Sequence, residues 1–461
     1  MRSQIGAIRN KFSHYARTLF PSVFSQRAYT HFLKNAFWSL LGAVLLRSQI
    51  IIISIFLSQI LPIHEFGKLG LIRSTIGTFT IFASVGVSIG ATKFISEAVA
   101  QGPTYIKSWI RFSYFITCIS ACLISAAILV FAHSLSVSIL KDGVLTSYLQ
   151  LSAVIIFLTT ILGTQIGILN GFQNFKKVAL LNLYGTLLSI PLQIYLSWVL
   201  GITGFLIATA ITTAIQIILY QLIIRNLLVK HKAYSAAKIT RAQKRKFIDF
   251  SIPAALSGFL VTPVSWYCNT VLVKGNNGYS EMAFFEIANN WRMILIFIPA
   301  TISQVVLPNI TAIHEKIKIK KLLYFNILLN SIFSLVACAA FILFSSYLLQ
   351  LYGTQYLNGE LAFNILIAST FFVSIANVTG QLIAGKMKMW YGFILNTLWA
   401  VAIIALSIYF IQYRNLGAEG LALAYFCSYS FHTLMQVIVF RLYFRNFKEP
   451  ANKLWVSATG A

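Results

Sequence analysis

Three arginines stand inside long apolar stretches of the sequence, where a charged side chain needs a specific partner. Arg47, Arg73 and Arg292 are flanked by residues that favour a bilayer interior, and a charge at that depth is costly unless it meets water, a counter-charge or a bound anion. The guanidinium group suits phosphate because it can form two parallel hydrogen bonds to it. The three arginines are therefore candidates for binding a phosphate-bearing substrate. The alternative is that helix carbonyls and neighbouring polar side chains satisfy each of them.

Carboxylates that could neutralise these arginines are scarce. The 461 residues include 10 Asp and Glu against 36 Lys and Arg, and Glu286 is the one acidic residue clearly within an apolar stretch. On a helix, Glu286 lies about 120° around the axis and about 9 Å along it from Arg292, so we do not expect these two to pair. At least two of the three arginines are predicted to lack a carboxylate partner.

Amide and indole side chains lie close to these arginines in the sequence. Asn289, Asn290 and Trp291 directly precede Arg292, whereas Trp266 and Asn269 lie in the preceding apolar stretch. Flat rings combined with hydrogen-bond donors suit a path for sugars, although buried aromatic residues usually pack in a core. These five residues are candidates for substrate binding.

Three protonatable residues are candidates for proton or sodium coupling: Asp249, Glu286 and His432. Each has a plainer alternative, which is a helix N-cap for Asp249 and a packing or interfacial position for the other two.

Three prolines inside apolar stretches are candidate hinges, because proline removes a helix hydrogen bond and bends the helix. They are Pro253, Pro263 and Pro299.

No motif indicates catalysis, a metal or a cofactor. The sequence lacks a paired carboxylate site, a nucleophile motif, metal-ligand spacing and a phosphate-binding glycine loop. The five cysteines all lie in apolar stretches, which predicts core positions rather than disulfides. The net charge is +26, but the sequence contains no basic domain large enough to form a nucleic-acid-binding face. We expect a protein that is not an enzyme and uses no cofactor. If an ion gradient drives its activity, we expect the ion to be a proton or sodium.

The elements that must position these residues are membrane-spanning helices. The chain is 58% hydrophobic and 10% charged, which is typical of a multi-spanning membrane protein. Twelve spans are predicted: 36–60, 69–92, 112–132, 149–170, 178–199, 204–224, 248–272, 283–307, 323–350, 361–384, 390–412 and 418–440. The outside loops are short, and the longest charged connection, Lys230 to Lys246, joins the sixth and seventh spans.

The distribution of positive charge predicts the orientation of these spans. With the N-terminus in the cytoplasm, the inside segments hold 29 Lys and Arg and the outside loops hold 4. Positively charged segments stay on the cytoplasmic side, so both termini are predicted to be cytoplasmic. Residues 1–34 read as a basic amphipathic segment for an anionic membrane surface, with a disordered tail as the alternative.

A weak internal repeat divides the chain into two halves. An offset of 216 residues pairs Glu65 with Glu281 and Gly201 with Gly417. The predicted units are a six-helix bundle over 35–228, a basic cytoplasmic linker over 229–247, a second six-helix bundle over 248–445 and a cytoplasmic tail over 446–461. Six spans per half place both repeats in the same orientation, related by a pseudo-twofold axis along the membrane normal.

The order of several short motifs resembles one family, the polysaccharide or O-antigen flippases (Wzx type) of the multidrug/oligosaccharidyl-lipid/polysaccharide exporter superfamily. The motifs are Glu65 to Gly70, Gly86 to Glu97, Ile252-Pro253, Ala288 to Trp291 with Pro299 and Pro308, and Gly417 to Ala422. The resemblance implies two six-helix bundles in a V shape, as in MATE transporters, around a cationic lumen. It also implies transfer of an undecaprenyl-pyrophosphate-linked oligosaccharide between the leaflets of a bacterial inner membrane.

The leading hypothesis is therefore a lipid-linked oligosaccharide flippase for O-antigen or a related surface polysaccharide. Its expected partners are the glycan lipid, the bilayer and, in assembly, a polysaccharide polymerase and a chain-length regulator. A drug or cation antiporter of the same fold is the alternative, but it predicts an acidic cavity. A membrane polymerase or ligase is the alternative of another class, and the short outer loops argue against it.

Overall fold

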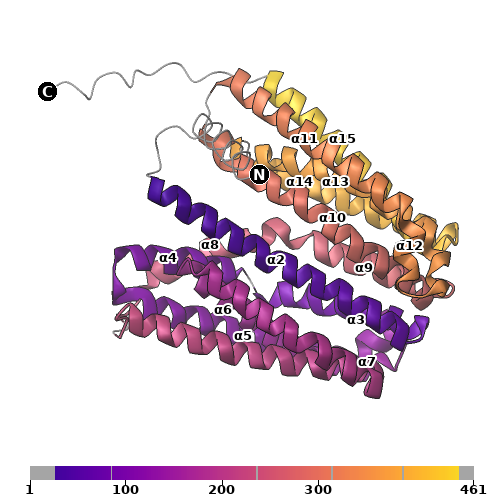
Figure 1. Cartoon of the computed structure of the whole chain (residues 1–461), viewed down its shortest axis with the longest axis horizontal. Helices are drawn as coiled ribbons and strands as arrows, with labels where there is room; N and C mark the ends of the chain where they lie inside the picture. The colour runs from indigo at the N-terminus through magenta and orange to yellow at the C-terminus, as the bar shows by residue number, and fades with distance from the viewer. Residues whose placement is uncertain (1–25, 85, 235–236, 313–314, 387–388, 446–461) are drawn as a thin grey trace, which may run out of the picture.

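The chain folds into long helices joined by short turns (Figure 1). The computed structural model describes residues 26–445 except positions 85, 235–236, 313–314 and 387–388. No β-strand occurs among these described residues. Residues 1–25 of the predicted basic N-terminal segment, and the whole predicted tail, lie outside them.

The first half of the chain forms one lobe. Its helices are α2 (Gln26–Ile60), α3 (Ile63–Ser84), α4 (Val87–Gln101), α5 (Ile106–Ser134), α6 (Leu145–Gly171) and α7 (Phe175–Lys230). Helices α3 and α4 meet at an angle of 43°. Gly86 stands at this break with a φ of 68°, a left-handed conformation that glycine adopts without a Cβ penalty.

Helix α7 contains two antiparallel halves rather than one straight rod. Gly201 interrupts its helical geometry with φ 61° and ψ −140°. The halves face each other through hydrogen bonds from Gln193 Nε2 to Thr209 Oγ1 and from Tyr220 Oη to Asn182 Oδ1, both 3.0 Å long. The reversal at Gly201 separates the fifth and sixth predicted spans.

The second half supplies the remaining helices. They are α8 (Arg241–Phe259), α9 (Val261–Val273), α10 (Gly278–Ala312), α11 (Lys316–Leu343), the short α12 (Ser345–Gln350), α13 (Glu360–Lys386), α14 (Met389–Ile408) and α15 (Gly417–Arg445). Helices α9 to α15 form the second lobe, with α13 packed against α10, α11 and α15. Helix α8 instead packs on α4 of the first lobe, where Phe247 contacts Phe94, and Phe247 also stacks on Trp109 of α5.

The seventh predicted span is broken at Leu260, between α8 and α9. Pro263 has no N–H to donate to the carbonyl of Phe259, so the helix cannot continue its ladder there. Pro253 lies within α8 and Pro299 within α10, and neither helix is divided at its proline. Of the three candidate hinges, only Pro263 coincides with a break.

Helix α8 also begins earlier than expected. Thr240 caps it by accepting a hydrogen bond from Gln243 N, and the Gln243 side chain accepts one from Thr240 N in return. Asp249 is therefore not an N-cap, and that interpretation is wrong. It lies one turn from Arg245 in mid-helix, with 3.7 Å between Asp249 Oδ2 and Arg245 Nε.

All twelve predicted spans overlap helices of the structure. By length and apolar composition, eight described helices could cross a membrane, or nine if the bent α3–α4 pair is one span. Helix α7 counts once here although it reverses at Gly201, and α8, α9 and α10 are not among the eight. The helical two-lobed architecture is confirmed, and the number twelve is consistent with it.

The two lobes repeat the same order of elements. Helix α3 begins at Ile63 and α10 at Gly278, and α6 begins at Leu145 and α13 at Glu360. Gly201 and Gly417, which the offset of 216 pairs, both have positive φ, at 61° and 52°. In Figure 1, helices α4, α5, α6 and α7 of the first lobe lie below α2, and helices α11, α13, α14 and α15 of the second lobe lie above α10.

Candidate functional site

Several of the predicted site residues gather where α2 and α3 of the first lobe meet α9 and α10 of the second. We call this contact the lobe seam. Helix α10 presents Glu286, Asn290, Met293 and Phe297 to the first lobe, and these positions share one helix face because they are separated by three or four residues.

An ion pair crosses the seam. Arg73 Nη1 of α3 lies 3.8 Å from Glu286 Oε1 of α10, with the two side chains 20% and 11% exposed. The guanidinium also lies over the Phe205 ring, 4.7 Å from its centroid. Gly70 makes room for the pair, since a Cβ there would meet the Glu286 side chain at 3.2 Å. One predicted anion-binding arginine is thus partly neutralised by the one membrane-depth carboxylate.

Arg47 reaches the seam from α2. Its Nη1 donates a 2.7 Å hydrogen bond to the Met293 carbonyl, and its guanidinium carbon lies 4.5 Å from the centre of the Phe297 ring. No carboxylate pairs with Arg47 among the described residues. Its charge is therefore available to an anion that enters the seam.

Uncharged hydrogen bonds join the lobes around the arginines. Asn290 Nδ2 donates to Ser54 Oγ over 3.2 Å, and Asn269 Nδ2 donates to Ser74 Oγ over 3.0 Å. A third bond, 2.9 Å long, runs from the Trp266 indole N–H to Thr75 Oγ1. Asn290, Asn269 and Trp266, which the sequence singled out, thus lie together at the seam.

Arg292 lies on another face of α10 and points into the second lobe. It is 5% exposed, and its guanidinium carbon lies 5.0 and 5.2 Å from the ring centres of Tyr425 and Tyr429 on α15. Its one hydrogen bond to a described residue is a long one, 3.4 Å from Nη1 to Asn289 Oδ1, and its buried Nε has no partner among these residues. A buried cation with so few acceptors is poorly satisfied. Arg292 therefore does not point into the lobe seam, where Arg47 and Arg73 lie.

Two further predicted residues also lie inside the second lobe. Trp291 packs edge-on against Phe341 of α11, with ring centres 5.6 Å apart. His432 of α15 is 7% exposed, and its Nε2 lies 3.5 Å from Gln436 Nε2. These contacts fit packing roles.

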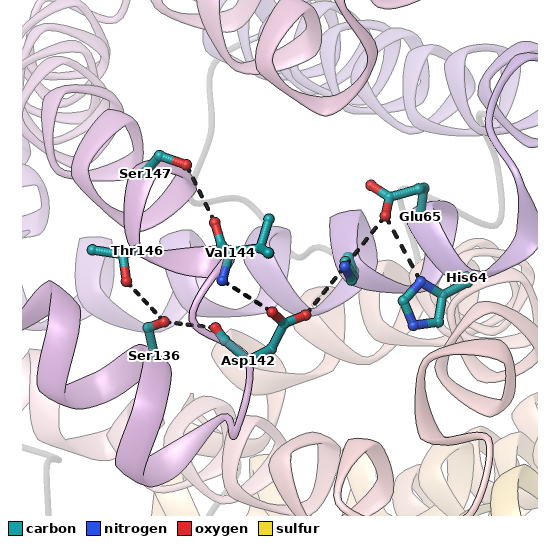
Figure 2. Close-up of polar contacts among 8 residues, drawn as sticks. His64, Glu65, Ser136, Asp142, Val144, Thr146 and Ser147 are labelled. Atoms are coloured by element: carbon teal, nitrogen blue, oxygen red, sulfur yellow. Dashed lines mark hydrogen bonds and ion pairs between the residues drawn. The ribbon is translucent and has the colours of Figure 1, made fainter.

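A buried lysine cluster lies at one end of the seam and was not foreseen (Figure 2). Lys68 Nζ of α3 lies 3.1 Å from Asp142 Oδ2 and 3.3 Å from Glu65 Oε1. Asp142 stands in the loop between α5 and α6, and its Oδ1 accepts a 3.0 Å bond from Val144 N. Lys68 also lies 5.5 Å from the ring centre of Tyr279 in α10, so the cluster touches both lobes.

The lysine cluster marks what we call the outer-loop end, where the loops predicted to be periplasmic lie. Contacts between the lobes are dense there. The Ser58 hydroxyl donates to the Tyr352 carbonyl over 3.1 Å, and Gln59 Nε2 donates to the Leu351 carbonyl over 2.9 Å. A Cβ on Gly67 would collide with the Tyr279 carbonyl, so α3 and α10 touch through their backbones.

Two helical lobes of this kind define the fold of the MOP superfamily transporters. An inward-facing MATE family transporter aligns with 87% of this chain and 96% of its own, at 16% identity and a TM-score of 0.73. An outward-facing structure of a MATE family transporter gives a TM-score of 0.60. A Pyrococcus furiosus MOP transporter, described by the reverse polarity of its binding pocket, gives 0.66 at 16% identity.

The sequence comparison is more specific. The family model described as "Polysaccharide biosynthesis protein" matches residues 32–314, and the chain belongs to this family. Among curated proteins, the EPS I polysaccharide export inner membrane protein EpsE of Ralstonia nicotianae is 23% identical over 418 residues, covering 88% of this chain and 93% of EpsE. The Ralstonia solanacearum EpsE is equally similar. The predicted family resemblance is confirmed.

Proposed function

We propose that this protein is a flippase that moves undecaprenyl-pyrophosphate-linked oligosaccharide from the cytoplasmic to the periplasmic leaflet of a bacterial inner membrane by alternating access. The observation that carries the proposal is the set of membrane-depth arginines with one carboxylate among them, in a member of a polysaccharide biosynthesis family. Arg47 and Arg292 have no carboxylate partner among the described residues, and anions are the ligands that stabilise such cations.

In this proposal the parts of the substrate occupy chemically matched surroundings. The diphosphate binds the arginines, the sugars hydrogen-bond to the seam amides Asn269 and Asn290 and to Trp266, and the polyprenyl tail stays in lipid. A polymerase and a chain-length regulator would act on the delivered unit. The cation antiporter alternative is weaker, because among the described residues the seam offers one carboxylate at membrane depth, Glu286, and it already faces Arg73.

Substitution of Arg292 tests the proposal. Arg292→Ala should lower surface glycan at least about tenfold, since a charge-assisted hydrogen bond contributes roughly 1.5–3 kcal/mol. Arg292→Lys should keep part of the activity because the charge remains, and Arg292→Glu should be at least as damaging as Ala. The measurement is surface glycan in a flippase-deleted strain carrying each variant, normalised to protein in the membrane.

Arg225→Ala is the matched control, because Arg225 lies exposed near the end of α7. If Arg292 only hydrogen-bonds to helix carbonyls, the variants should rank differently in glycan export. Arg292→Gln should then be tolerated, and any loss of export should follow the amount of protein in the membrane. Near-normal export by Arg292→Ala or Arg292→Glu would exclude an anion site at this residue.

A further inference from the structure

A cavity of about 330 Å³ opens in the second lobe at the outer-loop end. It lies between the loops before α10, α13 and α15, which are the three outer loops of the second half. Its volume is at the lower end of the range for small-molecule sites. The polar side chains that line it are Asn276, Asn277, Asn358, Asn415, Glu281 and Glu419. No lysine, arginine or histidine lines it.

The lining amides are free to bind a ligand. All four asparagines are exposed, and none of their side chains hydrogen-bonds to another described residue. Glu281 is already engaged, because its Oε2 accepts a 2.6 Å bond from Ala418 N at the start of α15. The cavity thus presents amide donors and acceptors with one uncommitted carboxylate, Glu419.

The repeat explains why this cavity is open. The offset of 216 residues pairs Glu65 with Glu281, and it pairs Lys68 and Asp142 of the first lobe with Phe284 and Asn358 of the second. In the first lobe the Lys68 ammonium lies between two carboxylates, 3.3 Å from Glu65 Oε1 and 3.1 Å from Asp142 Oδ2. The second lobe has neither that lysine nor that aspartate. The same place therefore holds amides around open space instead of an internal ion pair.

We propose that this cavity binds an uncharged sugar unit. Asparagine amides can both donate hydrogen bonds to sugar hydroxyls and accept them, and the Glu419 carboxylate can accept a hydrogen bond from a hydroxyl. Phe284, Ile411 and Leu416 add apolar wall for the C–H face of a ring. Phosphate and acidic sugars are disfavoured, because two carboxylates and no cation line the cavity.

The inference rests on the proposed function and makes it more specific. The membrane-depth arginines would hold the diphosphate, whereas this cavity lies among the loops that we predict to be periplasmic. A neutral sugar of the glycan could bind there as the oligosaccharide emerges. The substrate class favoured by the cavity is thus a glycan with an uncharged hexose or N-acetylhexosamine.

Sugar binding to the purified full-length protein tests the inference. Saturation-transfer NMR would titrate glucose, galactose, N-acetylglucosamine and glucuronic acid against the wild type and the double variant Asn276→Ala/Asn358→Ala. At least one neutral sugar should bind, and the double variant should raise its Kd about tenfold, as expected for the loss of two hydrogen-bonding groups. Glucuronic acid should bind more weakly than glucose.

Gln355→Ala is the matched control, because it removes an exposed amide from the Thr354–Gly359 turn without touching the cavity lining. Its Kd should stay within about twofold of the wild type. Glu419→Gln provides a second, nearly isosteric test and should weaken a neutral sugar less than the double variant does. Melting temperatures of all variants check that they fold.

Three results would overturn the inference: no neutral sugar binds the wild type, the double variant binds as well as the wild type, or the cavity variants abolish ²³Na binding while sugar binding is unchanged. The last result would identify a cation site instead. Glycan export separates the two proposals. Normal export with no sugar bound at the cavity removes only this inference, whereas cavity-dependent sugar binding without any export removes the flippase proposal.

Discussion

Glu286 faces Arg73 at a separation, 3.8 Å, that allows charge attraction without a short hydrogen bond. A diphosphate that binds Arg73 must compete with this carboxylate. We propose that Glu286 holds Arg73 in place while no substrate is bound, a role that differs from carrying a proton. This pairing connects two of the sequence candidates that had been assigned to separate functions.

Neutralising the two partners one at a time and together separates stability from transport. Arg73→Gln leaves a largely buried carboxylate without its counter-charge and should destabilise the protein by roughly 1–3 kcal/mol, less than for a fully buried pair. The double variant Arg73→Gln/Glu286→Gln should recover most of that loss. Export should stay low in both, because the anion-binding charge is gone. Thermal melting in detergent and glycan export are the two measurements.

Glu286→Gln alone is the informative third variant, because it frees the arginine for an anion. If the double variant exported glycan as well as the wild type, Arg73 would be a structural residue and not part of the substrate site.

The residues of the seam could be selected from the sequence, but their arrangement could not. The sequence alone shows a charged residue within an apolar stretch, and Arg47, Arg73 and Arg292 are identified in this way. Which helix face each one uses depends on contacts between distant parts of the chain, such as Arg73 with Glu286. Lys68 was overlooked because it stands at the edge of a predicted span and its partner Asp142 lies in a loop.

At the scale of elements, α3 and α10 approach each other so closely at Gly67 that no side chain fits at this position. A Cβ at Gly67 would collide with the Tyr279 carbonyl, whereas one at Gly77 of the same helix would meet nothing within 4 Å. Gly67→Ala should therefore separate the helices and destabilise the outer-loop contact by about 1–3 kcal/mol. Gly77→Ala should stabilise α3 by roughly 0.5–1 kcal/mol, because alanine is the better helix former.

Melting temperature and thiol labelling of a cysteine at position 58 would measure these effects. Gly67→Ala should lower the first and speed the second, while Gly77→Ala should leave labelling unchanged. If the two variants had the same melting temperature and labelling rate, the α3–α10 contact would be able to accommodate the added methyl group without loss of stability.

The break at Leu260 gives Pro263 a testable role. Pro263→Ala restores the N–H that can donate to the Phe259 carbonyl, and α8 and α9 should then join into one straighter helix. Because α8 packs on the first lobe and α9 on the second, such a helix would resist relative movement of the lobes. Export should fall severalfold with near-normal expression. Equal loss of expression and export would reduce Pro263 to a structural kink.

Hydropathy located the helices well, because each predicted span is an apolar stretch of the length a bilayer requires. It placed their ends less well. Helix α8 starts at Arg241 because of the Thr240–Gln243 capping box, a polar signal outside the apolar stretch. The prolines predicted several hinges, yet neighbouring packing decides which proline breaks a helix, and only the structure shows that packing.

At the scale of the whole molecule, the lobes are joined most closely at the outer-loop end. The hydrogen bonds of Ser58 and Gln59, the α3–α10 backbone contact and the Lys68 cluster all lie there. If that end is periplasmic, as the charge distribution predicts, the structure represents a state closed to the periplasm. Transport by alternating access then requires these contacts to break in every cycle.

A reversible cross-link across this contact tests that requirement. In a variant with the five native cysteines replaced, Gln59→Cys and Leu351→Cys would place thiols on the two lobes where Gln59 Nε2 now donates to the Leu351 carbonyl. A short, disulfide-containing bismaleimide should join them and reduce glycan export at least about tenfold, because the outer end can no longer open. Reductant should cleave the linker and restore export. Each single cysteine variant, treated in the same way, is the control. Export that continues while the two thiols are linked would mean that the lobes need not separate at this end, and the alternating-access proposal would have to be abandoned.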